Sequence, residues 1–182
     1  MIAGSIYGLC SEAAEVKEAL RSFRPDIIAI GISDEDLEAL RDKSAVDVYD
    51  SYFSQLSKFG EVSIPSPDFM ECMNYADMNG VGIKAISLND DEFSELLCSS
   101  VSSLELVARS RRRTKIRSRS AEDFSRGWDS RINRGGFERI NRICEQRMVE
   151  RIRALAESHE RILVLLDLPR FDGVTAILSK SS

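Results

Sequence analysis

A continuous apolar run, Ile27–Ile32, is the feature that most limits what this chain can fold into. Such a run suits a strand that is buried on both faces, and strands of this kind belong to parallel sheets covered by helices on both sides. Residues 162–168 form a second apolar run near the other end of the chain. Together the two runs predict an α/β domain.

The segments around the first run alternate between strand and helix patterns. A short strand from Ile2 to Tyr7 is expected, then a helix that begins after Ser11 and ends before Pro25. Ser33 and the residue three positions later form a capping-box pattern for the next helix. Strand, helix, strand and helix in this order predict a central, mainly parallel sheet with right-handed crossovers.

The rest of the chain continues this alternation. Helices are expected over residues 46–59 and 68–79, with a strand over 83–88 between the second of them and a long helix from Asn89 through Leu104. A further helix covers 140–155. After the apolar run at 162–168, a turn containing Gly173 is expected to lead into a last strand, Val174–Leu178. Residues 1–182 are the size of one domain.

The net charge of −5 is the sum of an acidic first part of the chain and a basic second part. Residues 1–108 hold 7 basic and 20 acidic side chains, whereas residues 109–182 hold 18 basic and 10 acidic ones. Such asymmetry marks either an anionic partner or two halves that complement each other in the fold or in a homo-oligomer. Composition does not choose between these interpretations.

Much of the positive charge is concentrated in residues 109–119. The basic side chains there are Arg109, Arg111, Arg112, Arg113, Lys115, Arg117 and Arg119. They could bind the phosphates of a nucleic acid, but no aromatic side chain is interleaved with them for base stacking. Apolar periodicity is also weak from 109 to 136. We therefore expect a basic, mobile helical or loop excursion within the domain, and we favour this interpretation over nucleic-acid binding.

The cysteines and the single histidine limit which catalytic and metal-binding sites the chain can form. Three of the four cysteines, Cys72, Cys98 and Cys144, fall on apolar faces of predicted helices, so we expect them to be reduced and buried. The single histidine, His159, excludes a histidine-based triad or a multi-histidine metal site, and we expect it at an exposed helix end.

The sequence also bears on cofactors and location. No cofactor is predicted, although a Mg²⁺ or Mn²⁺ site made of carboxylates remains open. The acidic clusters at 34–36 and 90–92 are better explained as first turns of helices. No apolar run approaches the roughly 20 residues that cross a bilayer. The first residues do not resemble a signal peptide, so we expect no membrane partner and a cytoplasmic location.

Five side chains follow predicted strands and are the candidate ligand-binding residues: Tyr7, Ser33, Asp34, Asp167 and Arg170. Ligands of open α/β sheets bind beyond the carboxyl ends of the strands, so these side chains are expected to converge. Tyr7 could donate a hydrogen bond, and Arg170 could hold the carboxylate or phosphate of a small anionic ligand. The alternative is that Arg170 only pairs with Asp167 or Asp172.

The order of segments resembles a known family. Residues 4–7, 24–30 and 37–40 are similar to the start of TraB/PrgY-type proteins, which include the pheromone-shutdown proteins and are related to the Tiki metalloproteases, the ChaN haem-binding proteins and the erythromycin esterases. Residues 76–88 resemble the family's Ala-x-x-x-Gly segment and the strand that follows it. The helix around Met148 and the chain to Leu178 resemble the family's closing unit.

The resemblance implies motifs that are altered here. The family pattern implies a histidine where this chain has Tyr7 and a glutamate where it has Gly31. Its late motifs are changed over residues 143–148 and 167–170. The resemblance therefore implies no catalytic residues and a catalytically altered or inactive domain that acts as a binding or interaction protein. Two alternatives stay open: a metal-dependent hydrolase that uses Asp34 and Asp167, and a nucleic-acid-binding protein.

Overall fold

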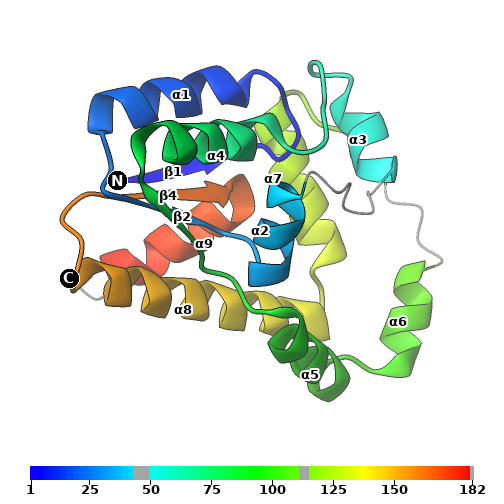
Figure 1. Ribbon diagram of the computed structural model, residues 1–182. Coiled ribbons are helices and arrows are strands. Elements are labelled where there is room, and N and C mark those ends of the chain that lie inside the picture. Colours follow the sequence, from blue (N-terminus) through cyan, green and yellow to red (C-terminus); the bar gives the residue numbers. More distant parts are fainter. Residues whose placement is uncertain (43–49, 111–114, 181–182) are drawn as a thin grey trace.

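The two apolar runs lie side by side in the middle of one sheet. The computed structural model describes residues 1–42, 50–110 and 115–180 (Figure 1). Within it, β2 (Ile27–Ile30) and β4 (Ile162–Asp167) pair in parallel. All four residues of β2 are buried, as expected for a strand covered on both faces.

Two shorter strands complete the sheet. β1 (Ile2–Ser5) pairs with β4, and β3 (Gly82–Ala85) pairs with β2, so the described strands have the order β1-β4-β2-β3 and are all parallel. The prediction of an α/β domain with a central parallel sheet is confirmed. The register places the carboxyl ends of the strands along one edge.

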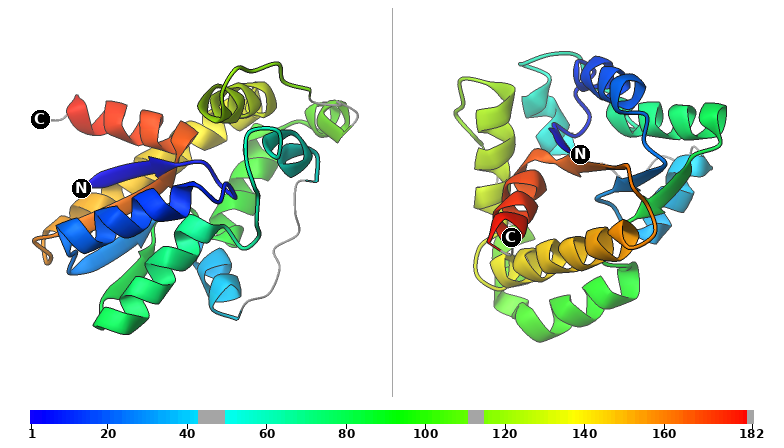
Figure 2. Two further views of the ribbon diagram at one scale, coloured as in Figure 1. Left: turned by 90° about the horizontal axis from the view of Figure 1, so that it is seen from above. Right: turned by 90° about the vertical axis from the view of Figure 1, so that its left-hand side faces the viewer.

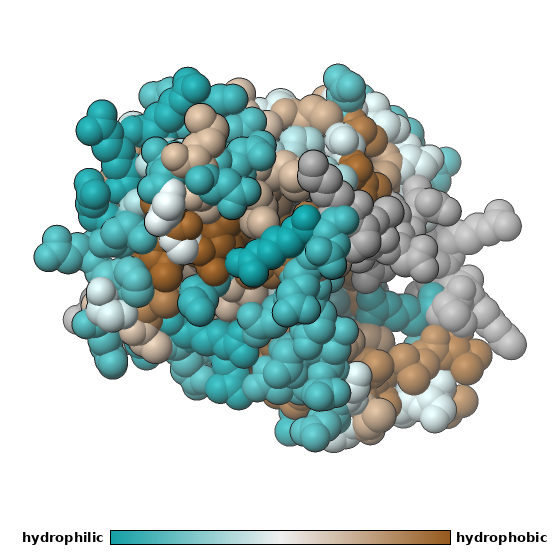
Figure 3. All heavy atoms as spheres, in the orientation of Figure 1, coloured by the Kyte–Doolittle hydropathy of each residue, from teal (hydrophilic) through white to brown (hydrophobic). Residues whose placement is uncertain are grey.

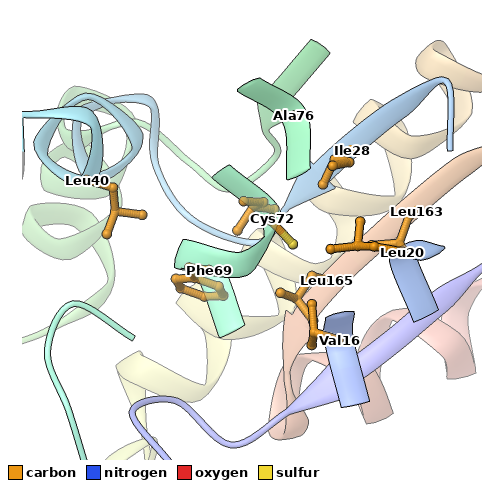
Figure 4. Close-up of a cluster of buried hydrophobic side chains, with 10 residues drawn as sticks. Val16, Leu20, Ile28, Leu40, Phe69, Cys72, Ala76, Leu163 and Leu165 are labelled. Atoms are coloured by element: carbon orange, nitrogen blue, oxygen red, sulfur yellow. The ribbon is translucent and has the colours of Figure 1, made fainter. Parts of the chain in front are cut away.

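One face of the sheet packs against α1 (Glu12–Phe23) and α4 (Pro67–Asn79). Leu163 and Leu165 of β4 both point to this face, because alternate residues of a strand lie on the same side of the sheet. Both side chains are fully buried there. Figure 4 shows these two side chains meeting those of both helices, with Cys72 of α4 among them.

The other face packs against α8 (Gly136–Ala156) and α9 (Leu168–Ser179), which lie opposite α1 and α4 (Figure 2). Val164 and Leu166 of β4 point to this side and contact a cluster that includes Val174 of α9. The sheet is thus covered by helices on both faces.

The prediction of a last strand at Val174–Leu178 is wrong, because these residues belong to α9. This helix contacts α7, α8, β1 and β4, so apolar side chains are needed on several of its sides. Its apolar residues therefore follow one another closely in sequence, which mimics a buried strand. Pro169, in the first turn, was the available helix signal.

The long helix expected from Asn89 through Leu104 is two helices, α5 (Asp90–Ser100) and α6 (Ser103–Ser110). The chain is extended at Val101, which is buried beside Ile140 of α8. α5 therefore ends at Ser100, immediately before this buried residue. Asn89 caps α5 in a complete capping box, and Ser33 caps α2 (Asp34–Arg41) as expected.

Residues 121–132, which lie in the stretch with weak apolar periodicity, form α7 (Ala121–Ile132). Phe124 and Trp128 are buried against Tyr52 of α3 (Asp50–Leu56). This part of the 109–136 segment belongs to the core and does not lie over it as an excursion. Residues 46–49, the start of the helix expected over 46–59, lie outside the described residues.

The cysteine and histidine expectations hold only in part. Cys72 and Cys144 are buried, but Cys98 is exposed because α5 has no buried residue of its own. His159 is half-buried, and its Nδ1 atom lies 3.2 Å from the carbonyl oxygen of Leu155. No helix among the described residues is both long and apolar enough to cross a membrane.

Candidate functional site

A cleft of about 540 Å³ lies at the carboxyl edge of the sheet. Tyr7 after β1, Gly31 after β2 and Asp167 at the end of β4 line one side of it. Residues of α7 and α9 line another, among them Trp128 and Arg170. In Figure 1 the strands point toward this side of the molecule, where α2 and α7 lie.

Three of the five candidate ligand-binding residues line this cleft: Tyr7, Asp167 and Arg170. They come from the ends of two neighbouring strands and from the first turn of α9. The expected convergence at the carboxyl edge therefore applies to these three.

The other two candidates, Ser33 and Asp34, have structural roles elsewhere. Ser33 is buried, and its Oγ accepts a hydrogen bond of 3.0 Å from the backbone N–H of Asp36 at the start of α2. Asp34 is exposed, and its Oδ2 atom lies 3.7 Å from Nη1 of Arg151 on α8. Neither lines the cleft.

Arg170 is held by groups other than those expected. Its Nη2 donates a 2.8 Å hydrogen bond to Asn141 Oδ1 and lies 3.5 Å from Asp129 Oδ1, and its Nη1 lies 3.6 Å from Glu145 Oε1. The expected partner Asp172 instead accepts a 2.6 Å hydrogen bond from Nε of Arg126. The Arg170 side chain is only 17% exposed, so these contacts fix its orientation.

Glycine lets α8 and α9 approach closely beside this arginine. A Cβ atom added at Gly173 would lie 2.2 Å from the carboxyl carbon of Glu145. Only a residue without a side chain leaves room for the Glu145 carboxylate next to α9.

Burial makes the carboxylates in the cleft and beside Arg170 hard to ionise. Desolvation raises the pKa of Asp167 from its usual 3.8 to about 6, although the nearby Arg170 acts to lower it and Asp129 to raise it. Desolvation also raises the pKa values of Asp129 and Glu145. The attraction of Arg170 therefore does not fully offset the cost of desolvating these carboxylates.

Aromatic side chains also line the cleft. The ring centroids of Tyr52 and Trp128 are 5.4 Å apart, and those of Tyr7 and Phe69 are 5.6 Å apart. Desolvation raises the pKa of Tyr52 to about 12, so its phenol stays protonated and able to donate a hydrogen bond. The sequence analysis did not identify Tyr52 or Trp128, although the spacing of Phe124 and Trp128 fits one helix face.

A buried polar cluster supports the loop that carries Tyr7. Asp68, at the start of α4, accepts a 2.5 Å hydrogen bond from Ser5 Oγ and a second one from Ser66 Oγ. Ser66 Oγ in turn accepts a 2.7 Å hydrogen bond from the backbone N–H of Gly8. Residues on both sides of Tyr7 are thus fixed to α4. This pairing joins residues 63 positions apart, so the sequence did not reveal it.

Of the basic residues in segment 109–119 that the structure describes, only Arg109 lines the cleft. Its guanidinium carbon lies 3.9 Å from the centroid of the Phe137 ring. Lys115, Arg117 and Arg119 are exposed, and no ion pair involves them within the described ranges. Arg111, Arg112 and Arg113 lie outside the described residues.

No group of three or more His, Cys, Asp or Glu side chains is arranged to hold a metal ion in the part of the chain that the structure describes. Asp167 lies in the cleft and Asp34 does not, so these two do not form a joint site. At Gly31, a Cβ atom would lie 2.7 Å from Leu166 Cδ2, so a glutamate there would require Leu166 to move.

Comparison with protein-family models and with curated proteins finds no match to this chain.

Proposed function

We propose that this chain is a catalytically altered domain with the TraB-like layout, and that it binds a small molecule in the carboxyl-edge cleft. The main support for this proposal is that Tyr7, Asp167 and Arg170 line one cleft at the edge where open α/β sheets bind ligands. The volume of about 540 Å³ is in the range of small-molecule sites. The Asp68 hydrogen bonds and the contacts of Arg170 hold its walls in place.

The proposal predicts no metal-dependent hydrolysis. With Mn²⁺ or Co²⁺ added, peptide and ester substrates should be turned over no faster by the protein than by the metal alone. The reason is that the proposed resemblance aligns Tyr7 and Gly31 with the family's histidine and glutamate, and that Asp34 contacts Arg151 and does not line the cleft. Turnover that is abolished by Tyr7→Phe or Asp167→Asn would instead establish the hydrolase alternative.

The proposal also covers location and assembly. We place the protein in the cytoplasm, because its cysteines are free and suit a reducing compartment.

We further propose that it forms a homo-oligomer. Apolar side chains of α6 gather on the surface shown in Figure 3, and Leu104 among them is 82% exposed.

We predict that the protein does not bind mixed-sequence DNA or RNA tightly at physiological salt. No aromatic side chain is interleaved with these basic residues, and Phe124, the first aromatic residue after them, is buried in the core, so no exposed ring beside the segment can stack on bases. The measurement compares the intact protein with a variant in which Lys115, Arg117 and Arg119 are changed to Ser. Tight, steeply salt-dependent binding that the variant loses would promote the nucleic-acid interpretation.

A further inference from the structure

We infer that the cleft takes an organic cation, namely an amine or ammonium group attached to an apolar or aromatic body. The inference rests on the proposed function, because it names the ligand class of the same cleft. It replaces the sequence-based expectation of a small anionic ligand, in which Arg170 would hold the anion and Tyr7 would donate a hydrogen bond.

The first step concerns the charges. Arg170 already contacts the carboxylates of Asp129 and Glu145 and donates a hydrogen bond to Asn141. An anion that reached its guanidinium would have to displace one of these groups and then lie close to the others. Like charges in a poorly solvated site repel strongly, so this arrangement disfavours an anionic ligand.

The second step concerns Asp167. This carboxylate lines the cleft, and no hydrogen bond or ion pair from its side chain to another residue is found among the described residues. It therefore differs from Asp129 and Glu145, which have Arg170 as a close partner. Desolvation raises its pKa although Arg170 acts to lower it, so the ionised carboxylate is only partly compensated in the folded protein. An ammonium group would supply that compensation and donate hydrogen bonds to the carboxylate.

The third step concerns the aromatic side chains. Tyr7, Tyr52, Phe69 and Trp128 line the same cleft as Asp167. Aromatic faces attract organic cations, and their rings also cover the apolar body of a ligand. A carboxylate together with several aromatic rings is a combination that favours a cation with an apolar body over either a bare inorganic ion or a neutral polar molecule.

The test uses three probes of similar shape: phenethylamine, which is cationic, hydrocinnamate, which is anionic, and phenethyl alcohol, which is neutral. Trp128 is the single tryptophan of the chain and lines the cleft, so its fluorescence reports occupancy. Titrations are made at about pH 8, where the amine is charged and Asp167 is ionised. We expect phenethylamine to bind with a Kd of about 1 mM or lower, and at least about tenfold more tightly than hydrocinnamate.

Two variants locate the cation. Asp167→Asn removes the carboxylate and should weaken phenethylamine binding by at least about tenfold. Asp77→Asn makes the same chemical change on the exposed surface of α4, outside the cleft, and should leave binding unchanged. Equal affinities of the two variants for the amine would overturn the assignment to Asp167.

The outcomes separate this inference from the proposed function. Tighter binding of hydrocinnamate, lost in Arg170→Gln, would overturn the cationic class and leave the cleft as a binding site. Absence of binding by all three probes would count against the inference and the proposed function together.

Discussion

Replacing Phe124 by alanine is expected to lower the free energy of unfolding by about 3–5 kcal/mol, the usual cost of deleting a buried phenylalanine side chain. Phe124 is 1% exposed, and its ring lies 5.3 Å from that of Tyr52 and 5.9 Å from that of Trp128. The deletion leaves a cavity between α3 and α7. Because a domain of this size is stable by about 5–15 kcal/mol, the loss is a large fraction of the total. Urea unfolding followed by circular dichroism measures it.

Phe93→Ala is the matched control. This phenylalanine on α5 is 42% exposed, so the same substitution should cost about 1 kcal/mol or less. Similar losses for the two variants would mean that α7 does not belong to the core and that residues 121–132 form the surface excursion that weak periodicity suggests.

Gly8→Ala is expected to destabilise the fold by about 2–5 kcal/mol, the sum of a backbone and a packing contribution. Gly8 has a φ of 85°, a conformation that costs an L-residue about 1–2 kcal/mol. A Cβ atom there would also lie 2.2 Å from Cε1 of Phe53, and forced overpacking typically costs a further 1–3 kcal/mol, roughly. The loop that carries Tyr7 would have to move, so ligand binding in the cleft should weaken as well.

Gly80→Ala separates the two contributions. Gly80 ends α4 with a φ of 65°, and nothing lies within 4 Å of its added Cβ atom. This variant should show only the backbone strain, about 1–2 kcal/mol by thermal or urea unfolding. If Gly8→Ala costs no more than Gly80→Ala, then Phe53 does not pack against the loop as the structure has it.

Much of the sheet could be predicted because its signals are local. The buried run at Ile27–Ile30 marks a strand by itself, and Ser33 and Asn89 mark helix starts through side chains three residues from their partners. The strand expected at Val174–Leu178 failed for a physical reason. A helix with neighbours on several sides needs apolar residues in close succession, and periodicity alone cannot separate that pattern from a buried strand.

The cleft could be predicted where a residue lies at or shortly after the end of a strand, as Tyr7, Asp167 and Arg170 do. Ser33 and Asp34 also follow a strand, but they are used to start α2 and to contact α8. The groups that hold Arg170 come from α7 and α8, which enter the site through tertiary packing. No local pattern connects Asp129 or Glu145 to Arg170, so the acidic character of the cleft emerged only from the structure.

The stability of Asp167→Asn as a function of pH tests most directly whether Asp167 serves the cleft or the fold. The pKa of Asp167 is raised in the folded protein, so its contribution to stability is fully present below about pH 4 and is lost as the pH rises through about 6. Asparagine avoids this loss and starts a helix as well as aspartate does.

We therefore predict that the variant becomes more stable than the wild type as the pH rises from about 4 to above 6. A pKa rise of this size corresponds to at most about 3 kcal/mol, and partial exposure to solvent reduces the expected gain to about 1–2 kcal/mol. Asp77→Asn should show no such gain. Urea unfolding at a series of pH values gives the answer: a gain confined to the higher pH values agrees with a carboxylate kept uncompensated for a ligand, whereas a loss of stability at about pH 8 would show that Asp167 holds the fold together and would contradict the account.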